Sequence, residues 1–192
     1  MAQHTVETRY TVDSYFTLVD TGNLSPTDRV ELLDGVIVAE PPQNPRHASG
    51  ITRVDGALRK AVGERAVVRV QSPFIAAPYS VPEPDVAVVP GHEADYDDRH
   101  PTMALLIVEV ADTSLPQDRL SKARIYAAAG CPEYWVLNLR DDWVEVLRAP
   151  DLQAHDYAER RLAHRGDRLE LVALPGAAVA VDDLLPGRAE GG

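Results

Sequence analysis

The feature that most constrains this chain is a pair of carboxylates placed on two short apolar segments. Asp85 directly precedes the run Val86–Val89, and Glu109 interrupts the apolar run 105–110. Short, continuously apolar runs are typical of strands that are covered on both faces. If these strands are neighbours, the two carboxylates meet at one edge of a buried sheet. Like charges held together repel each other, and a divalent cation is the usual way to keep both ionised.

Length and composition indicate one ordinary globular unit. The chain has 192 residues, of which 45% are hydrophobic and 26% charged. We expect a single domain, 1–192, with a core at about 10–147 and a strand-rich C-terminal extension at about 151–185. No apolar run approaches the ~18 residues that span a bilayer, and no secretory signal opens the chain, so we expect a cytoplasmic protein without membrane contact. A single cysteine, Cys131, excludes an intrachain disulfide and a cysteine-based zinc site.

The net charge of −11 argues against general coating of nucleic acid, which requires a broad basic surface. An acidic metal site remains compatible with this charge, because its substrate needs only a local basic rim. The best candidate for such a rim is the basic side of the predicted helix 47–62 with its preceding residue: Arg46, Arg53, Arg59 and Lys60.

Hydrophobic spacing predicts a mixed α/β core without the regular alternation of a doubly wound fold. Helices are expected at 10–20, 47–62 and 115–129, with Leu120, Ile125 and Ala128 of the last one facing inward. A β-hairpin is expected at 29–39 around Asp34-Gly35. Further strands are expected at 66–71, 86–89, 105–110, 133–138, 143–147, 157–163 and 168–172. No glycine-rich phosphate loop follows a strand, so the pattern does not favour a nucleotide-binding fold.

A lysine completes the set of groups that phosphodiester hydrolysis needs. Asp118 and Lys122 stand four residues apart and therefore share one face of the predicted helix that follows Glu109. Two acids, a cation and a lysine can together hydrolyse a phosphodiester. The alternatives are a surface ion pair for Asp118 and Lys122, a solvated strand start for Asp85, and an outward-facing edge position for Glu109.

Other polar residues are weaker candidates for the same cleft. Glu31 in the hairpin is a candidate further metal ligand, and His47 near a helix start is a candidate for contact with substrate or with the water on a metal. Gln71 and Tyr126 are candidate supporting residues. For each of these, a purely structural or exposed position is the alternative.

The order and spacing of these motifs resemble the Uma2 family, also called DUF820, within the PD-(D/E)xK restriction-endonuclease-like superfamily. The resemblance covers about residues 10–147 and is carried by positions 31–35, 41–42, 46–47, 84–89, 108–110, 118, 122, 126 and 129–136. It implies a restriction-endonuclease-like core, in which helices flank a central mixed sheet, with an N-terminal helix and β-hairpin.

The resemblance also implies a Mg²⁺- or Mn²⁺-dependent endonuclease that cleaves DNA. Asp85 and Glu109 would bind the metal, with Glu31 as an extra acid. The superfamily's usual lysine position, two residues after the second acid, is Ala111 here. Members of the family supply the lysine from the following helix, which corresponds to Lys122.

Two alternatives stay open at this point. One is a catalytically inactive binding or regulatory module with a nuclease fold, which the charge of −11 and Ala111 favour. Another is a hydrolase of RNA or of a different phosphodiester. We also expect a homodimer, because many restriction-type folds pair around a two-fold axis. The aromatic residues Tyr134, Trp135 and Trp143 belong either to the core or to such a dimer surface.

Overall fold

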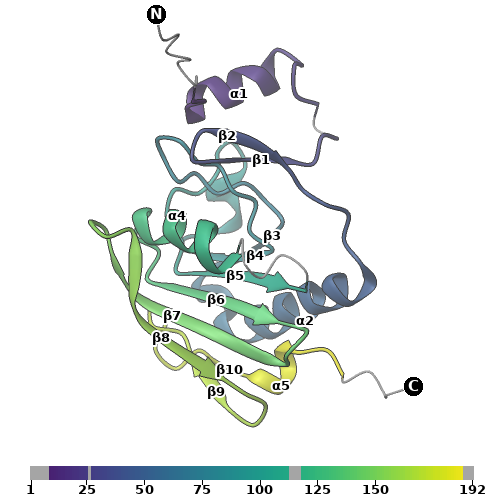
Figure 1. Ribbon diagram of the computed structural model, residues 1–192. Helices are drawn as coiled ribbons and strands as arrows, with labels where there is room; N and C mark the ends of the chain where they lie inside the picture. The colour runs from purple at the N-terminus through teal and green to yellow at the C-terminus, as the bar shows by residue number, and fades with distance from the viewer. Residues whose placement is uncertain (1–8, 26, 113–117, 188–192) are drawn as a thin grey trace, which may run out of the picture.

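A mixed six-stranded sheet forms the centre of the molecule (Figure 1). The computed structural model describes residues 9–25, 27–112 and 118–187. Across the sheet the strand order is β3-β4-β5-β6-β7-β8. The bounds are β3 (Val67–Val70), β4 (Val86–Val89), β5 (Leu106–Ala111), β6 (Glu133–Asn138), β7 (Trp143–Asp151) and β8 (Asp156–Ala163). Only β5 and β6 pair in parallel, and the other neighbours are antiparallel. The predicted mixed α/β fold class is therefore confirmed.

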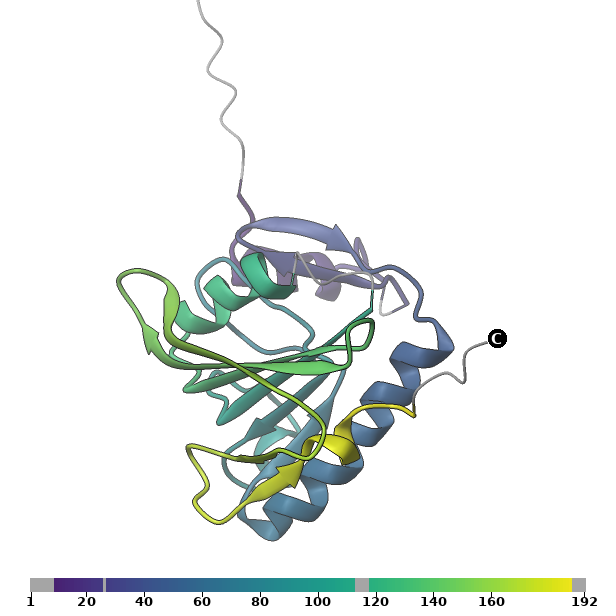
Figure 2. The same cartoon turned by 60° about the horizontal axis from the view of Figure 1, so that its bottom comes forward.

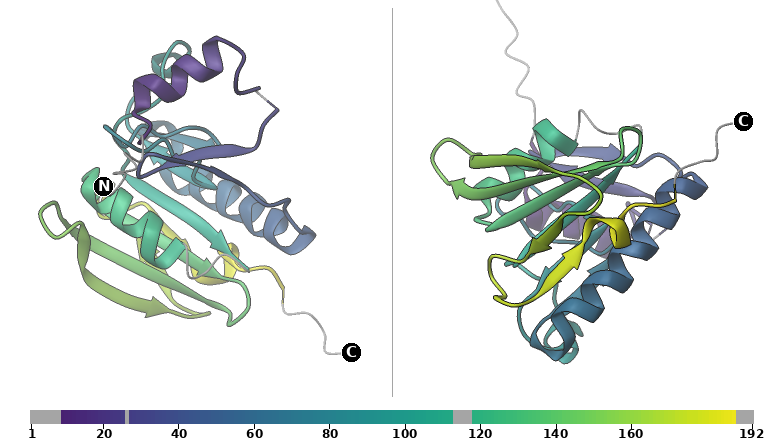
Figure 3. Two further views of the ribbon diagram at one scale, coloured as in Figure 1. Left: turned by 45° about the horizontal axis from the view of Figure 1, so that its top comes forward. Right: turned by 90° about the horizontal axis from the view of Figure 1, so that it is seen from below.

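Helices lie on both faces of this sheet (Figure 2). The long helix α2 (Pro45–Val62) runs along one face, and α4 (Ala123–Ala128) covers the other. Short helical turns are η1 (Gly63–Arg65), η2 (Glu93–Tyr96) and the π-helical turn η3 (Asp118–Lys122). At one end of the molecule, α1 (Val12–Asp20) packs on the hairpin of β1 (Val30–Leu33) and β2 (Val36–Ala39) (Figure 3).

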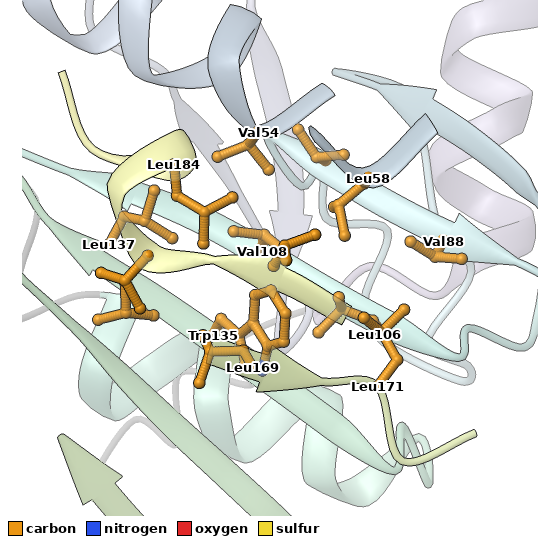
Figure 4. Close-up of a cluster of buried hydrophobic side chains, with 14 of the residues drawn as sticks. Val54, Leu58, Val88, Leu106, Val108, Trp135, Leu137, Leu169, Leu171 and Leu184 are labelled. Atoms are coloured by element: carbon orange, nitrogen blue, oxygen red, sulfur yellow. The ribbon is translucent and has the colours of Figure 1, made fainter. Parts of the chain in front are cut away.

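Elements from the end of the chain join the core on the α2 side. They are β9 (Arg168–Glu170), β10 (Ala178–Ala180) and α5 (Val181–Leu184). Leu169, Leu171 and Leu184 are buried in the same cluster as Val54 and Leu58 of α2 (Figure 4). Full burial of such a side chain contributes about 1.5–3 kcal/mol. The sequence pattern predicted β9 in a longer form and missed β10 and α5, because each has only three or four residues.

The predicted core interpretation of the aromatic residues is confirmed for two of the three. Trp135 lies among the buried side chains on the α2 side, and Tyr134 lies on the α4 side. Both are fully buried, so neither belongs to a surface. Trp143 is partly exposed at the start of β7. The homodimer itself stays a prediction.

The predicted helix 115–129 is wrong in form and in its inward face. Within the described residues, a π-helical turn leads into the short α-helix α4. Leu120 is 66% exposed and Ala128 is exposed, whereas Ile125 is buried as predicted. A π-helix bonds residue i to i+5 and has more residues per turn than an α-helix. Leu120 and Ile125 stand five residues apart, about 140° around an α-helix, so they do not share a face. The buried side chains of α4 are instead Ala123, Ile125, Tyr126 and Ala127.

Helix α2 approaches the central strand closely through a glycine. A side-chain carbon added at Gly50 would lie 2.8 Å from Cγ1 of Val110 in β5. Glycine costs about 1 kcal/mol relative to alanine inside a helix. The close approach explains its presence, and it brings the N-terminal turn of α2 next to the end of β5.

The N-terminal prediction is confirmed in detail. Helix α1 begins after Thr11, whose hydroxyl accepts a hydrogen bond from the Ser14 amide, and the hairpin turns at Asp34-Gly35. No helix in the described ranges is long and apolar enough to cross a membrane. The division into a core and an extension near residue 150 stays a prediction.

Candidate active site

The two sequence-predicted acids lie side by side at one end of the β4–β5 pair. Val86 pairs with Val108 in the antiparallel register, which puts Asp85 next to Glu109. The Val110 amide donates to Oδ2 of Asp85 over 2.8 Å, and the Asp85 amide donates to Oε2 of Glu109 over 3.4 Å. Both side chains are buried. The predicted convergence of the carboxylates is therefore present, and backbone amides of the sheet hold them.

Lys122 and Tyr126 meet Glu109 from the helical layer. Lys122 Nζ lies 3.2 Å from Oε1 of Glu109, and the Tyr126 hydroxyl donates to the same oxygen over 2.7 Å. Burial, and next the charge of Glu109, raise the pKa of the Tyr126 phenol well above its ordinary value, so the hydroxyl remains a donor.

Ala111 shows why the lysine arrives from a helix. Alternate residues of a strand share a face, so Ala111 and Glu109 both point toward the α4 layer, where Ala111 is fully buried. Lys122 comes from the end of η3, in that same layer, and places its ammonium beside the acid. Lys122 therefore brings a lysine next to Glu109, although the strand itself carries Ala111.

Glu31 extends the ion-pair network into the hairpin. Its Oε2 lies 3.3 Å from Lys122 Nζ and accepts a hydrogen bond from the Glu83 amide over 3.2 Å. Burial raises the pKa of the Glu31 carboxyl above its ordinary value, and the charge of Lys122 opposes this shift. In this geometry Glu31 contacts Lys122, and the role of Glu31 as a metal ligand stays a prediction.

His47 reaches the site from the first turn of α2. Its Nε2 lies 3.2 Å from Oδ2 of Asp85. Asn44 caps the helix by accepting hydrogen bonds from the amides of Arg46 and His47, each over 3.0 Å. The Asn44 side chain also donates to Asp112 over 2.7 Å, which ties the helix start to the end of β5. The cap therefore sets the position of the histidine.

Of the remaining candidates, the structure places Gln71 at the site but does not describe the side chain of Asp118. Gln71 follows β3 with a positive φ of 44°, and its amide donates to the Asp85 carbonyl over 3.2 Å. It lines the same pocket as the acids. The side chain of Asp118 lies outside the described residues, so its predicted supporting place in the site is still a prediction.

A pocket of about 100 Å³ opens onto these groups. Its walls come from the hairpin, the start of α2 and the ends of the central strands: Arg29, Glu31, Ala39, Glu40, Pro41, Gln43, His47, Gln71, Glu83, Asp85, Glu109 and Lys122. Burial, then the charges of Glu40 and Glu31, raise the pKa of Glu83 above its ordinary value. The pocket is thus rich in acids, and Arg29 and Lys122 are its cationic residues.

The donor set fits a magnesium-type ion better than zinc. Mg²⁺ is commonly held by one or two carboxylates together with water and substrate oxygens, whereas structural and catalytic zinc sites use three or four protein ligands. Asp85 and Glu109 supply two adjacent carboxylates. Across the described parts of the chain, no group of three or more His, Cys, Asp or Glu side chains is arranged to hold a metal ion.

Sequence reasoning missed several residues that shape the site. Asn44 was signalled by the Asn-Pro pair, which is typical of a helix start. Glu83 was signalled by its place beside Pro84-Asp85. Arg29 and Glu40, which form a 3.4 Å ion pair across the hairpin, carried no sequence signal beyond their charge.

The predicted basic rim on α2 is only partly available to a ligand. Arg46 donates to the Leu139 carbonyl, and Arg59 donates to the Val68 carbonyl and pairs with Asp55. Arg53 and Lys60 are exposed. The two tied arginines therefore act in the fold, and the exposed pair stays the candidate for a phosphate contact.

Comparison with known proteins gives a family match and a structure of similar fold. The model of the Uma2 family, described as "Putative restriction endonuclease", matches residues 12–182. A solved structure described as "a putative nuclease belonging to DUF820", from Anabaena variabilis ATCC 29413, has a similar fold, with a TM-score of 0.68 at 15% identity. The similarity covers 91% of this chain and 97% of that one. A search of curated proteins found no match.

Proposed function

This chain belongs to the Uma2 family of restriction-endonuclease-like proteins, and on that premise we propose that it is a metal-dependent endonuclease that hydrolyses phosphodiester bonds in DNA. The observation that carries the proposal is the adjacency of Asp85, Glu109 and Lys122 at one end of the central strands. Two buried acids beside a buried lysine are difficult to explain by stability alone, since desolvation of such groups costs several kcal/mol per ion.

Asp85 and Glu109 would hold a Mg²⁺ or Mn²⁺ ion. Such an ion polarises a phosphate and provides a water nucleophile at neutral pH. The protein's part is to present both carboxylates in one place, which the antiparallel register and the backbone amides of Asp85 and Val110 do. Glu31 is proposed as an extra acid at the same pocket.

Lys122 and Tyr126 orient the Glu109 carboxylate by donating to Oε1. We assign a second task to Lys122. Its ammonium, placed among the acids, would offset the charge that develops on the phosphate during in-line attack. His47 would position Asp85 through its 3.2 Å contact and lies on the pocket wall, where substrate would pass. Gln71 and Asp118 are proposed as supporting residues.

The first test is cleavage of plasmid DNA, single-stranded DNA and RNA with Mg²⁺, Mn²⁺ or EDTA. Asp85→Asn and Glu109→Gln keep the size of the side chains but remove the charges that would hold the ion, and we expect both to abolish cleavage. Asp151→Asn, an exposed acid on β7, is the matched control and should cut as the parent does. Full activity in Asp85→Asn or Glu109→Gln would refute the site assignment.

A specific observation favours a second candidate function. Lys122 lies within 3.3 Å of both Glu31 and Glu109, so its single charge offsets part of the charge of these acids without a metal, and the usual lysine position is Ala111. These features suit an inactive nuclease fold that binds nucleic acid or regulates another protein. Binding of DNA with equal affinity in Mg²⁺ and EDTA, without cleavage of any substrate, would favour this candidate. Cleavage of RNA alone would change the substrate class and leave the chemistry intact.

A homodimer completes the proposal for double-stranded DNA, since two copies around a two-fold axis can cut both strands. Sedimentation of the purified protein with and without a DNA duplex measures this directly. A monomer in both conditions would limit the activity to one strand at a time.

A further inference from the structure

A second and larger pocket is lined by the turn of the β1–β2 hairpin, by segment 76–80 and by α4. Its volume is about 420 Å³, within the range of small-molecule sites. The hairpin contributes to the walls of both pockets, and η3, which carries Lys122, leads directly into α4, which carries Arg124. Glu31 and Lys122 face the active site, whereas Asp34 and Arg124 line the second pocket.

Two arginines make this pocket locally basic in an acidic protein. Arg9 and Arg124 line it with one carboxylate, that of Asp34, and His155. The two guanidinium groups and one carboxylate leave a local net charge of +1 with His neutral, against −11 for the chain. Arg124 is exposed and has no hydrogen bond or ion pair with any other described residue. An exposed guanidinium with no partner among the described residues is well suited to a phosphate, which it can bind through two parallel hydrogen bonds.

The pocket also offers an aromatic surface. The guanidinium carbon of Arg9 lies 5.3 Å from the centre of the Tyr79 ring, and its Nε donates to the Asp34 carbonyl over 3.0 Å. Tyr79 is 39% exposed, so part of its ring is accessible. Stacking on an aromatic side chain or an arginine plane contributes about 1–3 kcal/mol for a nucleic-acid base.

The Asp34 carboxylate distinguishes this pocket from a simple anion site. It would repel a bare phosphate, yet it can accept a hydrogen bond from an amino group of a base or a sugar hydroxyl. Ser80, whose hydroxyl accepts a bond from the Asp34 amide over 2.9 Å, adds another polar group. A ligand that carries both a phosphate and a planar, amine-bearing ring matches all of these groups.

We propose that this pocket binds a nucleoside phosphate, with the phosphate on Arg124, the base against Tyr79 and Arg9, and the base amine toward Asp34. The ligand is either a free nucleotide or one unit of a nucleic-acid strand. The second source rests on the proposed function, because it makes the pocket a subsite for the same substrate. Binding to the pocket requires neither metal nor cleavage.

Calorimetric titration in EDTA with dAMP, inorganic phosphate and adenosine tests the proposal. We expect dAMP to bind more tightly than either half. Arg124→Ala and Tyr79→Leu should each weaken dAMP binding at least about tenfold, whereas Tyr79→Phe retains most of the affinity. Arg168→Ala, an exposed arginine on β9 outside the lining of this pocket, is the control and should bind as the parent does. No dAMP binding to the parent, or unchanged binding in Arg124→Ala, would overturn the proposal.

An 8-nucleotide single strand in EDTA separates the two sources. If Arg124→Ala no longer binds the strand, the pocket is a subsite for a strand. If Arg124→Ala loses dAMP binding but binds the strand as the parent does, the ligand is a free nucleotide. Asp85→Asn separates this inference from the proposed function, since it should retain dAMP binding while cleavage disappears. A urea unfolding curve of Arg124→Ala that matches the parent excludes a folding defect.

Discussion

Replacing Tyr126 with phenylalanine removes a single oxygen from the centre of the candidate site. The Tyr126 side chain is fully buried, and its hydroxyl donates to Oε1 of Glu109 over 2.7 Å. A short hydrogen bond to a charged acceptor contributes about 1.5–3 kcal/mol to stability. Glu109 keeps the Lys122 contact at 3.2 Å, so the carboxylate is not left without a donor. We therefore expect Tyr126→Phe to fold but to lose stability within that range.

The loss can be measured by urea unfolding and by calorimetry. For a chain of this size, each kcal/mol lowers the melting temperature by about 2–4 °C, so Tyr126→Phe should melt roughly 3–12 °C lower. The urea midpoint should fall without a change in the slope of the unfolding free energy, because the same surface is exposed on unfolding. If the protein cleaves DNA, the rate should fall about 10–100-fold, as for outer-shell partners of metal ligands.

Tyr157→Phe is the matched control. Tyr157 is also buried, but its hydroxyl donates to the neutral carbonyl of Cys131 over 3.0 Å, away from the site. A neutral hydrogen bond contributes about 0.5–1.5 kcal/mol, so this variant should lose less stability and no activity. Equal losses of stability and activity in the two variants would refute the claim that Tyr126 acts through the Glu109 charge.

Three further predictions concern the rest of the molecule. Leu58→Ala should lower the urea midpoint by an amount equivalent to about 2–5 kcal/mol, since Leu58 is fully buried between α2 and the sheet. An unchanged midpoint would place Leu58 outside the core. Arg148→Ala should destabilise the protein by about 3 kcal/mol in the same assay, because it removes the cation at 2.7 Å from the fully buried Glu133 and leaves only neutral donors there. As the control, Arg160→Ala at an exposed ion pair should destabilise the protein by less than about 1 kcal/mol. His100 makes stability depend on pH, because burial, and then the charge of Arg69, lower the pKa of its imidazole below 6.5. The unfolded chain therefore binds the proton more readily than the folded chain. As pH falls from 6.5 through the folded-state pKa, the free energy of unfolding decreases. His100→Phe retains a ring against Phe16 and should show a smaller drop in melting temperature between pH 8 and pH 5.5, and an identical drop would contradict this assignment.

The acid pair illustrates how far local sequence could predict the site. The apolar runs around Asp85 and Glu109 predicted two buried strands, and their motif order predicted the family. What the runs could not show is the register that pairs Val86 with Val108, because strand pairing depends on contacts between distant segments. That register decides that each carboxylate accepts a hydrogen bond from a backbone amide of the other segment.

The lysine illustrates the opposite case. A 3.6-residue period predicted one continuous helix around Lys122, yet the chain forms a π-helical turn there before α4 begins. Neither helix period nor residue type encodes that change, since it results from packing of the segment on the sheet. The contacts of Lys122 with both Glu31 and Glu109 follow from this tertiary arrangement.

The sequence by itself determined the mixed α/β class, the hairpin at Asp34-Gly35, and the buried character of β4 and β5. Each of these depends on interactions between residues close in the chain or on a period that apolar residues carry directly. Only the tertiary structure decided which charges meet, because a buried carboxylate is stabilised by whichever amide, hydroxyl or ammonium the fold brings within about 3 Å. The same reason holds for the second pocket, because its two arginines stand far apart in the sequence and line one cavity only in the folded chain.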